Sequence, residues 1–155
     1  MSTDVHKLRR VVLPLILLVG DILTVFGAFC LAYYLRYVSP VGRLGIPVPD
    51  ARFTAYLPLL LLGTAFLAAA YAQLELYSER LLLRKLQSLN LVLKGTVLWL
   101  AAYLALSLVL KFDPPVSRWF VVLATISVLV LMFLWRNAAY FWLTRPKRVE
   151  TLRQR

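Results

Sequence analysis

A continuous apolar run from Val11 to Leu35 constrains the fold of this chain more than any other feature. Its 25 residues contain a single charged side chain, Asp21. A helix needs about 20 apolar residues to cross the roughly 30 Å hydrocarbon core of a bilayer, so this run is long enough to span a membrane. An ionisable group well inside such a span is expensive and normally faces a partner rather than lipid. The sequence therefore predicts a transmembrane helix whose carboxylate contacts a polar or charged group in another part of the chain.

Three further apolar segments predict an all-α, polytopic membrane protein with four transmembrane helices. The predicted spans cover residues 11–35, 56–76, 91–110 and 118–143. They form a transmembrane domain over residues 11–143, with an N-terminal segment at 1–10 and a basic tail at 144–155. The hydrophobic content of 61% is too high for a soluble domain of 155 residues and fits a small membrane protein.

The segment between the second and third spans predicts a short basic amphipathic helix. Leucines repeat at helical spacing within Ser78–Asn90, while Arg80 and Arg84 mark the opposite side. Such a helix is suited to lie among the lipid headgroups, so Arg80, Arg84 and Lys85 are the expected contacts for anionic lipid. The alternative is that this segment is a helical loop that extends the third span.

The distribution of basic residues predicts the orientation. With the N-terminus inside, the cytoplasmic segments hold 12 Lys and Arg residues and the outer segments hold 5. Because cytoplasmic segments carry the excess of Lys and Arg, both termini are expected in the cytoplasm. The basic residues fall between apolar blocks and at the chain ends, so the net charge of +11 indicates membrane topology and anionic lipid rather than nucleic acid.

Arg136 is the predicted partner of Asp21. It is the only deep charge of the fourth span, and the two helices run antiparallel in this topology. At about 1.5 Å per residue, Asp21 lies roughly 15 Å and Arg136 roughly 10 Å from the cytoplasmic ends of their spans. We therefore expect a structural ion pair between them. The alternative is that Arg136 extends to the headgroups and Asp21 is protonated or bonds to Thr24.

Residues that carry chemistry are scarce. One cysteine and one histidine, Cys30 and His6, are too few for a metal site. No phosphate-binding glycine motif, no H-E-x-x-H motif and no carboxylate pair with catalytic spacing is present. We expect no cofactor, no metal and no catalytic residue in this chain.

Short motifs in this frame resemble the N-terminal four-helix membrane region of bacterial polyprenyl-phosphate sugar-1-phosphate transferases, the enzymes that initiate exopolysaccharide and O-antigen synthesis. The matching residues are Arg9-Arg10, Asp21, Ala32-Tyr33-Tyr34-Leu35-Arg36, Leu76-Tyr77 with the basic segment that follows it, Ser117-Arg118, and Arg136. One residue departs from the family pattern: relatives usually have Gly before the Leu-Tyr, where this chain has Glu75. That departure argues against a tight turn at this place.

The resemblance implies a module that anchors and positions a transferase in the bacterial inner membrane. Its catalytic domain, which would bind polyprenyl phosphate, lies outside these 155 residues. Two alternatives stay open: the membrane region of a nucleotide-sugar epimerase or dehydratase, and a stand-alone four-helix transporter or flippase that uses Asp21 as its coupling carboxylate. Besides membrane lipids, a second copy of the chain is a possible partner, because Ala65, Ala68, Ala69 and Ala70 offer a surface for close helix contact.

Overall fold

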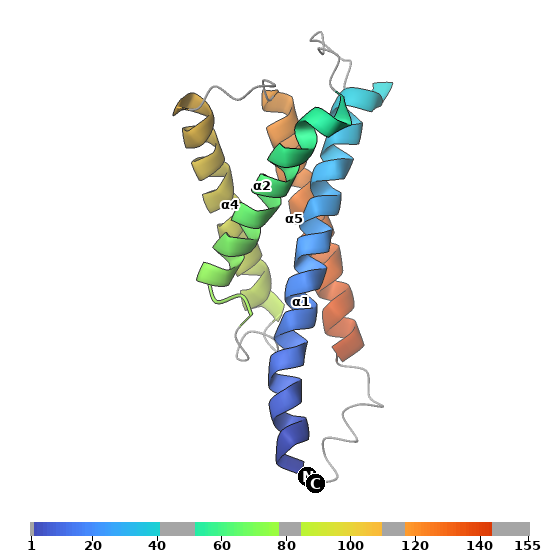
Figure 1. Cartoon of the computed structure of the whole chain (residues 1–155), viewed down its shortest axis with the longest axis vertical. Coiled ribbons are helices and arrows are strands. Elements are labelled where there is room, and N and C mark those ends of the chain that lie inside the picture. The colour runs from blue at the N-terminus through green and yellow to red at the C-terminus, as the bar shows by residue number, and fades with distance from the viewer. Residues whose placement is uncertain (1, 41–51, 78–84, 110–116, 144–155) are drawn as a thin grey trace.

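The computed structural model describes residues 2–40, 52–77, 85–109 and 117–143, and these residues are helical apart from short turns. The elements are α1 (Ser2–Tyr33), η1 (Tyr34–Val38), α2 (Phe53–Gln73), α4 (Lys85–Val109) and α5 (Arg118–Leu143). The segment η1 continues α1 with a wider π-helical turn. Figure 1 shows the helices as one bundle, with α1 extending beyond the end of α5.

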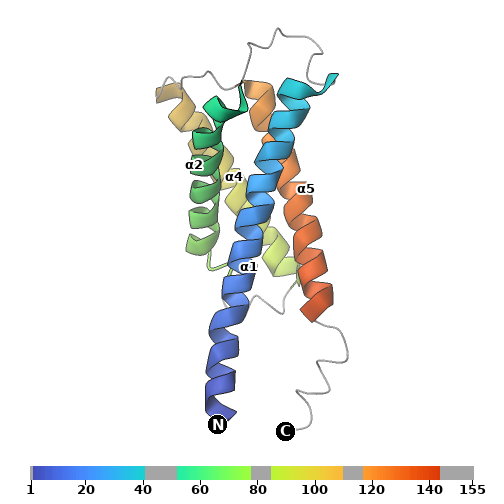
Figure 2. The same cartoon turned by 45° about the vertical axis from the view of Figure 1, so that its right-hand side comes forward.

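The helices alternate in direction along the bundle. Figures 1 and 2 place the N-terminal end of α1, the C-terminal ends of α2 and α5, and the start of α4 at one end, which we call the terminal end. Helix α1 packs against α5 and α2, and α4 packs against the same two helices. The four helices therefore close a ring in which α1 and α5 are antiparallel neighbours.

Length and composition make the protein a multi-pass membrane protein. Within the described residues, four helical segments are long and apolar enough to cross a bilayer: Val12–Val38, Phe53–Gln73, Leu86–Ala105 and Arg118–Trp142. The prediction of an all-α chain with four spans is confirmed. Many large apolar side chains lie exposed on the outside of the bundle, as expected for a surface that contacts membrane lipid.

The boundary predicted between an interfacial helix and the third span is absent. Residues 78–84, which hold Arg80 and Arg84, lie outside the described residues. From Lys85 onward, the chain is one continuous helix through Asn90 into the span. No Gly or Pro separates the two segments, so nothing in the sequence breaks the helix there. The described part of the predicted interfacial helix is therefore the beginning of α4.

Aromatic side chains fill the half of the bundle away from the terminal end. The Phe29 and Trp99 rings lie 5.3 Å apart between centroids and join α1 to α4. The ring of Tyr33 lies 5.7 Å from that of Tyr56 on α2. The candidate site around Asp21 and Arg136 lies nearer the terminal end than these rings.

Candidate functional site

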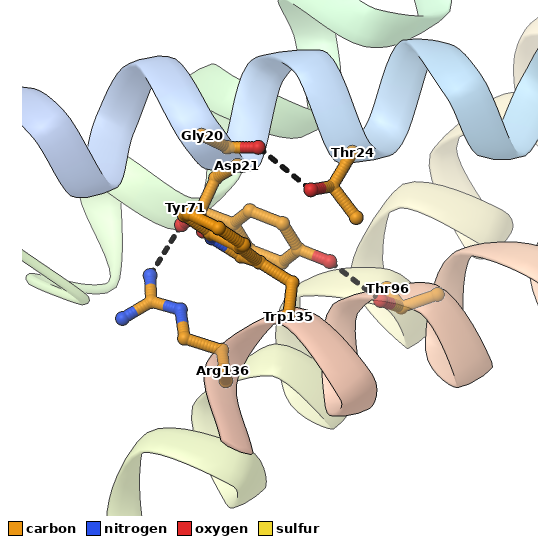
Figure 3. Close-up of polar contacts among 7 residues, drawn as sticks. All are labelled: Gly20, Asp21, Thr24, Tyr71, Thr96, Trp135 and Arg136. Carbon is orange, nitrogen blue, oxygen red and sulfur yellow. Dashed lines mark hydrogen bonds and ion pairs between the residues drawn. The ribbon is translucent and has the colours of Figure 1, made fainter. Parts of the chain in front are cut away.

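Asp21 lies inside the bundle and contacts two residues of α5. It is 1% exposed. The Arg136 guanidinium donates to one carboxylate oxygen, Oδ2, and forms an ion pair with it. The Trp135 indole donates from Nε1 to the other oxygen, Oδ1, at 2.9 Å. Both oxygens are thus occupied by neighbouring residues of one helix (Figure 3).

Gly20 makes this arrangement sterically possible. A Cβ atom at position 20 would lie 2.1 Å from Cζ2 of the Trp135 ring, a separation that real atoms do not adopt. Because glycine carries no side chain, the indole ring lies directly against the backbone of α1. The Gly20-Asp21 dipeptide therefore provides both the space for Trp135 and the acceptor for its N–H group.

The turn after α2 brings a third element to the cluster. The Tyr77 ring centroid lies 5.7 Å from the central carbon of the Arg136 guanidinium, within the range of a cation–π contact. Burial raises the pKa of the Tyr77 phenol, so this side chain is neutral at physiological pH. The arginine thus lies between the carboxylate of α1 and the aromatic ring that follows α2.

A Schellman turn fixes the position of Tyr77. The backbone N–H of Leu76 donates to the carbonyl of Tyr71 at 3.1 Å, and that of Glu75 donates to Ala72 at 3.0 Å. These two bonds satisfy carbonyls at the end of α2. Glu75 occupies the left-handed position with φ of 55°, where glycine is the usual residue. The turn therefore forms, although the glutamate at position 75 predicted against it.

A neighbouring contact joins α2 to α4. The hydroxyl groups of Tyr71 and Thr96 are hydrogen-bonded at 2.9 Å in the interior, and both residues are fully buried. Thr96 also donates to the Val92 carbonyl of its own helix. Figure 3 shows this pair beside the Asp21 contacts. Together the contacts involve all four long helices.

Two polar atoms of the cluster have no hydrogen bond to any described residue. They are the Nε atom of Arg136 and the hydroxyl of Tyr77, and both atoms are buried. Because each such group costs free energy when it is left without a partner, the cluster is stabilised by its ion pair and ring contacts rather than by complete hydrogen bonding.

A second polar contact joins α1 to α5 at the opposite end of the bundle. Arg36 in η1 is only 3% exposed. Its Nε atom donates to the Ser117 hydroxyl at 3.2 Å, directly before α5. The Arg36 guanidinium also lies 6.0 Å from the Tyr37 ring centroid. Helices α1 and α5 are therefore joined by a polar contact toward each end.

Several residues named from the sequence are brought together and others are not. Asp21 and Arg136 are in direct contact. The Thr24 hydroxyl, offered as an alternative partner of Asp21, instead donates to the Gly20 carbonyl at 2.7 Å. Arg80 and Arg84 lie outside the described residues, and Lys85 is the first residue of α4. The predicted lipid contacts therefore remain predictions.

Sequence reasoning missed the roles of Trp135, Tyr77 and Gly20. Tryptophan and tyrosine near the ends of spans are usually interfacial residues, so the pattern directs attention away from the interior. The available signal was position: Trp135 is adjacent to Arg136, and Gly20 is adjacent to Asp21. Each of the two buried charges is therefore next in sequence to a residue that takes part in the same interhelical contact.

The contacts of the cluster join α1 to α5 and to the turn after α2. No group of three or more His, Cys, Asp or Glu residues among the described residues is arranged to hold a metal ion. A general base needs an oxygen that reaches a substrate proton, but Asp21 is buried at 1% exposure and bonds to two residues of α5. The arrangement is suited to hold α1 and α5 in register.

Comparison with known proteins adds no assignment: no family model, no curated protein and no solved structure matches the chain. The functional conclusion therefore rests on the residues themselves and on the geometry described above.

Proposed function

We propose that this chain is the membrane-anchoring and positioning module of an enzyme that transfers a sugar-1-phosphate to polyprenyl phosphate. In this proposal the module lies in the bacterial inner membrane with both termini in the cytoplasm. The catalytic domain is a separate part of the enzyme, and the 155 residues serve to hold it at the membrane surface.

The observation that carries the proposal is the closed contact between Asp21 and α5. A carboxylate that couples transport must exchange protons or ions with water. Asp21 is 1% exposed, and Arg136 and Trp135 occupy its oxygens. These contacts favour a bundle of fixed geometry over the transporter alternative.

The residues behind the resemblance also contact one another. Asp21 pairs with Arg136, Tyr77 lies on the same arginine, and Arg36 bonds to Ser117. The short motifs thus form two sets of interhelical contacts at separate levels of the bundle. Residues of this kind support an anchor, because their contacts fix helix packing and leave no reactive group directed at a substrate.

The first test reads the coding sequence beyond codon 155. The proposal expects the frame to continue into a soluble domain with an acidic catalytic pair. Inner-membrane vesicles that contain the full-length protein should then transfer labelled sugar-1-phosphate from a nucleotide sugar to polyprenyl phosphate. An immediate stop codon, or a following domain that binds a nicotinamide cofactor, would overturn the proposal in favour of one of its alternatives.

Orientation is tested separately by reporter fusions after Arg155 and within the segment between α1 and α2. A cytoplasmic fluorescent protein should be active at Arg155, and a periplasmic phosphatase should be active in the α1–α2 segment. The reverse pattern would contradict the orientation predicted from the 12-to-5 distribution of basic residues.

Self-association through α2 is a further part of the proposal. Ala65 and Ala69 are exposed, Ala68 is half-buried, and Ala70 is directed into the bundle. A surface made of Ala65, Ala68 and Ala69 allows a second helix to approach closely. Crosslinking in native membranes should give a dimer or larger species, and a result of monomer alone would remove this part.

A further inference from the structure

An apolar groove lies between α1 and α5 near the terminal end of the bundle. Its volume is about 400 Å³, within the usual range of ligand pockets. The walls come from Leu13, Ile16 and Leu17 of α1 and from Trp135, Ala138 and Trp142 of α5, with Ala139 beside them. Alanines on α5 leave this space open where larger side chains would fill it.

The level of the groove matches one leaflet of a bilayer. All of its lining residues belong to the membrane-spanning segments. Trp142 stands at the end of its span, and Trp135 stands seven positions deeper. At 1.5 Å per residue the groove covers roughly 10 Å of depth. Half of a typical hydrocarbon core is about 15 Å, so an acyl chain of the adjacent leaflet runs alongside it.

Two arginines of α1 come directly before the groove wall in the sequence. Helix α1 is continuous from Ser2, and it extends beyond the end of α5 (Figure 2). In the sequence, Arg9 and Arg10 precede Leu13 by four and three positions, just outside the first span. Basic residues just outside the hydrocarbon attract anionic headgroups.

We propose that the groove between α1 and α5 is a binding site for an anionic phospholipid of the leaflet at the terminal end. One acyl chain lies between Leu13–Leu17 and Trp135–Trp142, and the phosphate group lies at the level of Arg9 and Arg10. The apolar walls explain the chain, the adjacent arginines explain the preference for negative charge, and the span boundary at Trp142 places the headgroup outside the hydrocarbon. This site is independent of the proposed transferase function.

The test uses the full chain in phosphatidylcholine nanodiscs with a phosphatidylglycerol that carries a photoactivatable diazirine in its acyl chain. Peptides that contain residues 13–17 and 135–142 should carry the crosslinked lipid. Replacing Ala138 or Ala139 by leucine fills the groove and should lower this labelling by about tenfold, which corresponds to about 1.4 kcal/mol of lost binding free energy. The Ala105→Leu variant is the control, because Ala105 is also exposed four residues before the end of its helix and lines no proposed surface.

A second arm tests the headgroup. A phosphatidylcholine with the same diazirine should label the groove more weakly than the phosphatidylglycerol. The Arg9→Gln and Arg10→Gln substitutions should each lower the preference for the anionic lipid by about fivefold. Because both arginines lie outside the predicted spans, these variants test the headgroup contact without altering the apolar walls.

Three results would overturn the inference. The first is labelling spread evenly around the bundle or unchanged by Ala138→Leu. The second is equal labelling by both lipids in the unaltered chain, which removes the anionic headgroup from the site. The third is a disulfide that joins two copies of an Ala138→Cys, Cys30→Ala variant under mild oxidation, which assigns the groove to self-association instead.

Discussion

The ion pair between Asp21 and Arg136 provides the sharpest test of how this bundle is held together. The experiment is a double-mutant cycle with Asp21→Asn and Arg136→Gln. Asp21 is 1% exposed and Arg136 is 8% exposed, so the relevant comparison is with buried ion pairs rather than surface ones. Removal of one partner from a buried pair typically costs about 3–5 kcal/mol, since the remaining charge is left uncompensated.

The two single variants should differ in magnitude. In Asp21→Asn the amide oxygen can still accept from Trp135, but the amide nitrogen then faces the guanidinium, so two donors meet beside a buried cation. Arginine cannot lose its proton in proteins, and the loss should approach about 5 kcal/mol. In Arg136→Gln the glutamine amide can donate to Asp21 and Trp135 keeps its bond, so the loss should be about 3 kcal/mol.

The double variant should be about as stable as Asp21→Asn alone, although it carries a second substitution. It buries two neutral amides in place of a charge without a partner, and each unsatisfied neutral group costs only about 1–3 kcal/mol. We expect a coupling free energy of about 3 kcal/mol, the upper end of values for residues in contact. Equilibrium unfolding in mixed dodecylmaltoside and dodecyl sulfate micelles, followed by circular dichroism, measures all four corners of the cycle.

A matched control uses the exposed arginine at the start of the same helix. Arg118→Gln should change the free energy of unfolding by less than about 0.5 kcal/mol, and it should add to Asp21→Asn without coupling. If Arg136→Gln were also additive with Asp21→Asn to within about 0.5 kcal/mol, the ion pair would contribute nothing specific and the reasoning would be refuted.

Two glycine substitutions test the close contacts. Gly20→Ala should cost about 1–3 kcal/mol in the same unfolding assay because the Trp135 ring must move and lose its bond to Asp21. Gly27→Ala is the control. Nothing lies within 4 Å of the new Cβ there, so this variant should be neutral or stabilising. Glu75→Gly should stabilise by about 1 kcal/mol because glycine adopts positive φ without strain, whereas Glu75→Ala should not; equal stability of the two variants would contradict a strained left-handed residue.

Sequence alone was sufficient for the four spans, because a bilayer imposes a one-dimensional requirement on length and composition. The sequence also indicated which two charged residues form the ion pair. A deep carboxylate and a deep guanidinium are rare in such a chain, and Asp21 and Arg136 have matching depths in neighbouring helices. Span boundaries differ by a few residues: the second apolar segment covers Phe53–Gln73 rather than 56–76, and the third covers Leu86–Ala105 rather than 91–110. Apolar patterns do not mark where a helix extends past the hydrocarbon.

The interior environment of the pair could not be predicted because it depends on helix rotation and on side-chain packing. The exposed residues of α1 and α5 are as apolar as their buried residues, so periodicity does not indicate which face of a membrane helix meets its neighbour. Trp135 is directed at Asp21 only because Gly20 lets the two helices approach there. Gly20 and Trp135 are 115 positions apart in the sequence, so no local pattern predicts their contact.

The turn at Glu75 shows how packing overrides a local preference. A non-glycine residue in the left-handed region costs about 1–2 kcal/mol, which is why the glutamate argued against a turn. The turn places the next residue, Leu76, at zero exposure against the bundle, and complete burial of a leucine contributes about 1.5–3 kcal/mol. The same geometry brings the Tyr77 ring to Arg136. Burial of Leu76 together with the contact at Arg136 exceeds the strain at Glu75, so the strained turn is the stable one.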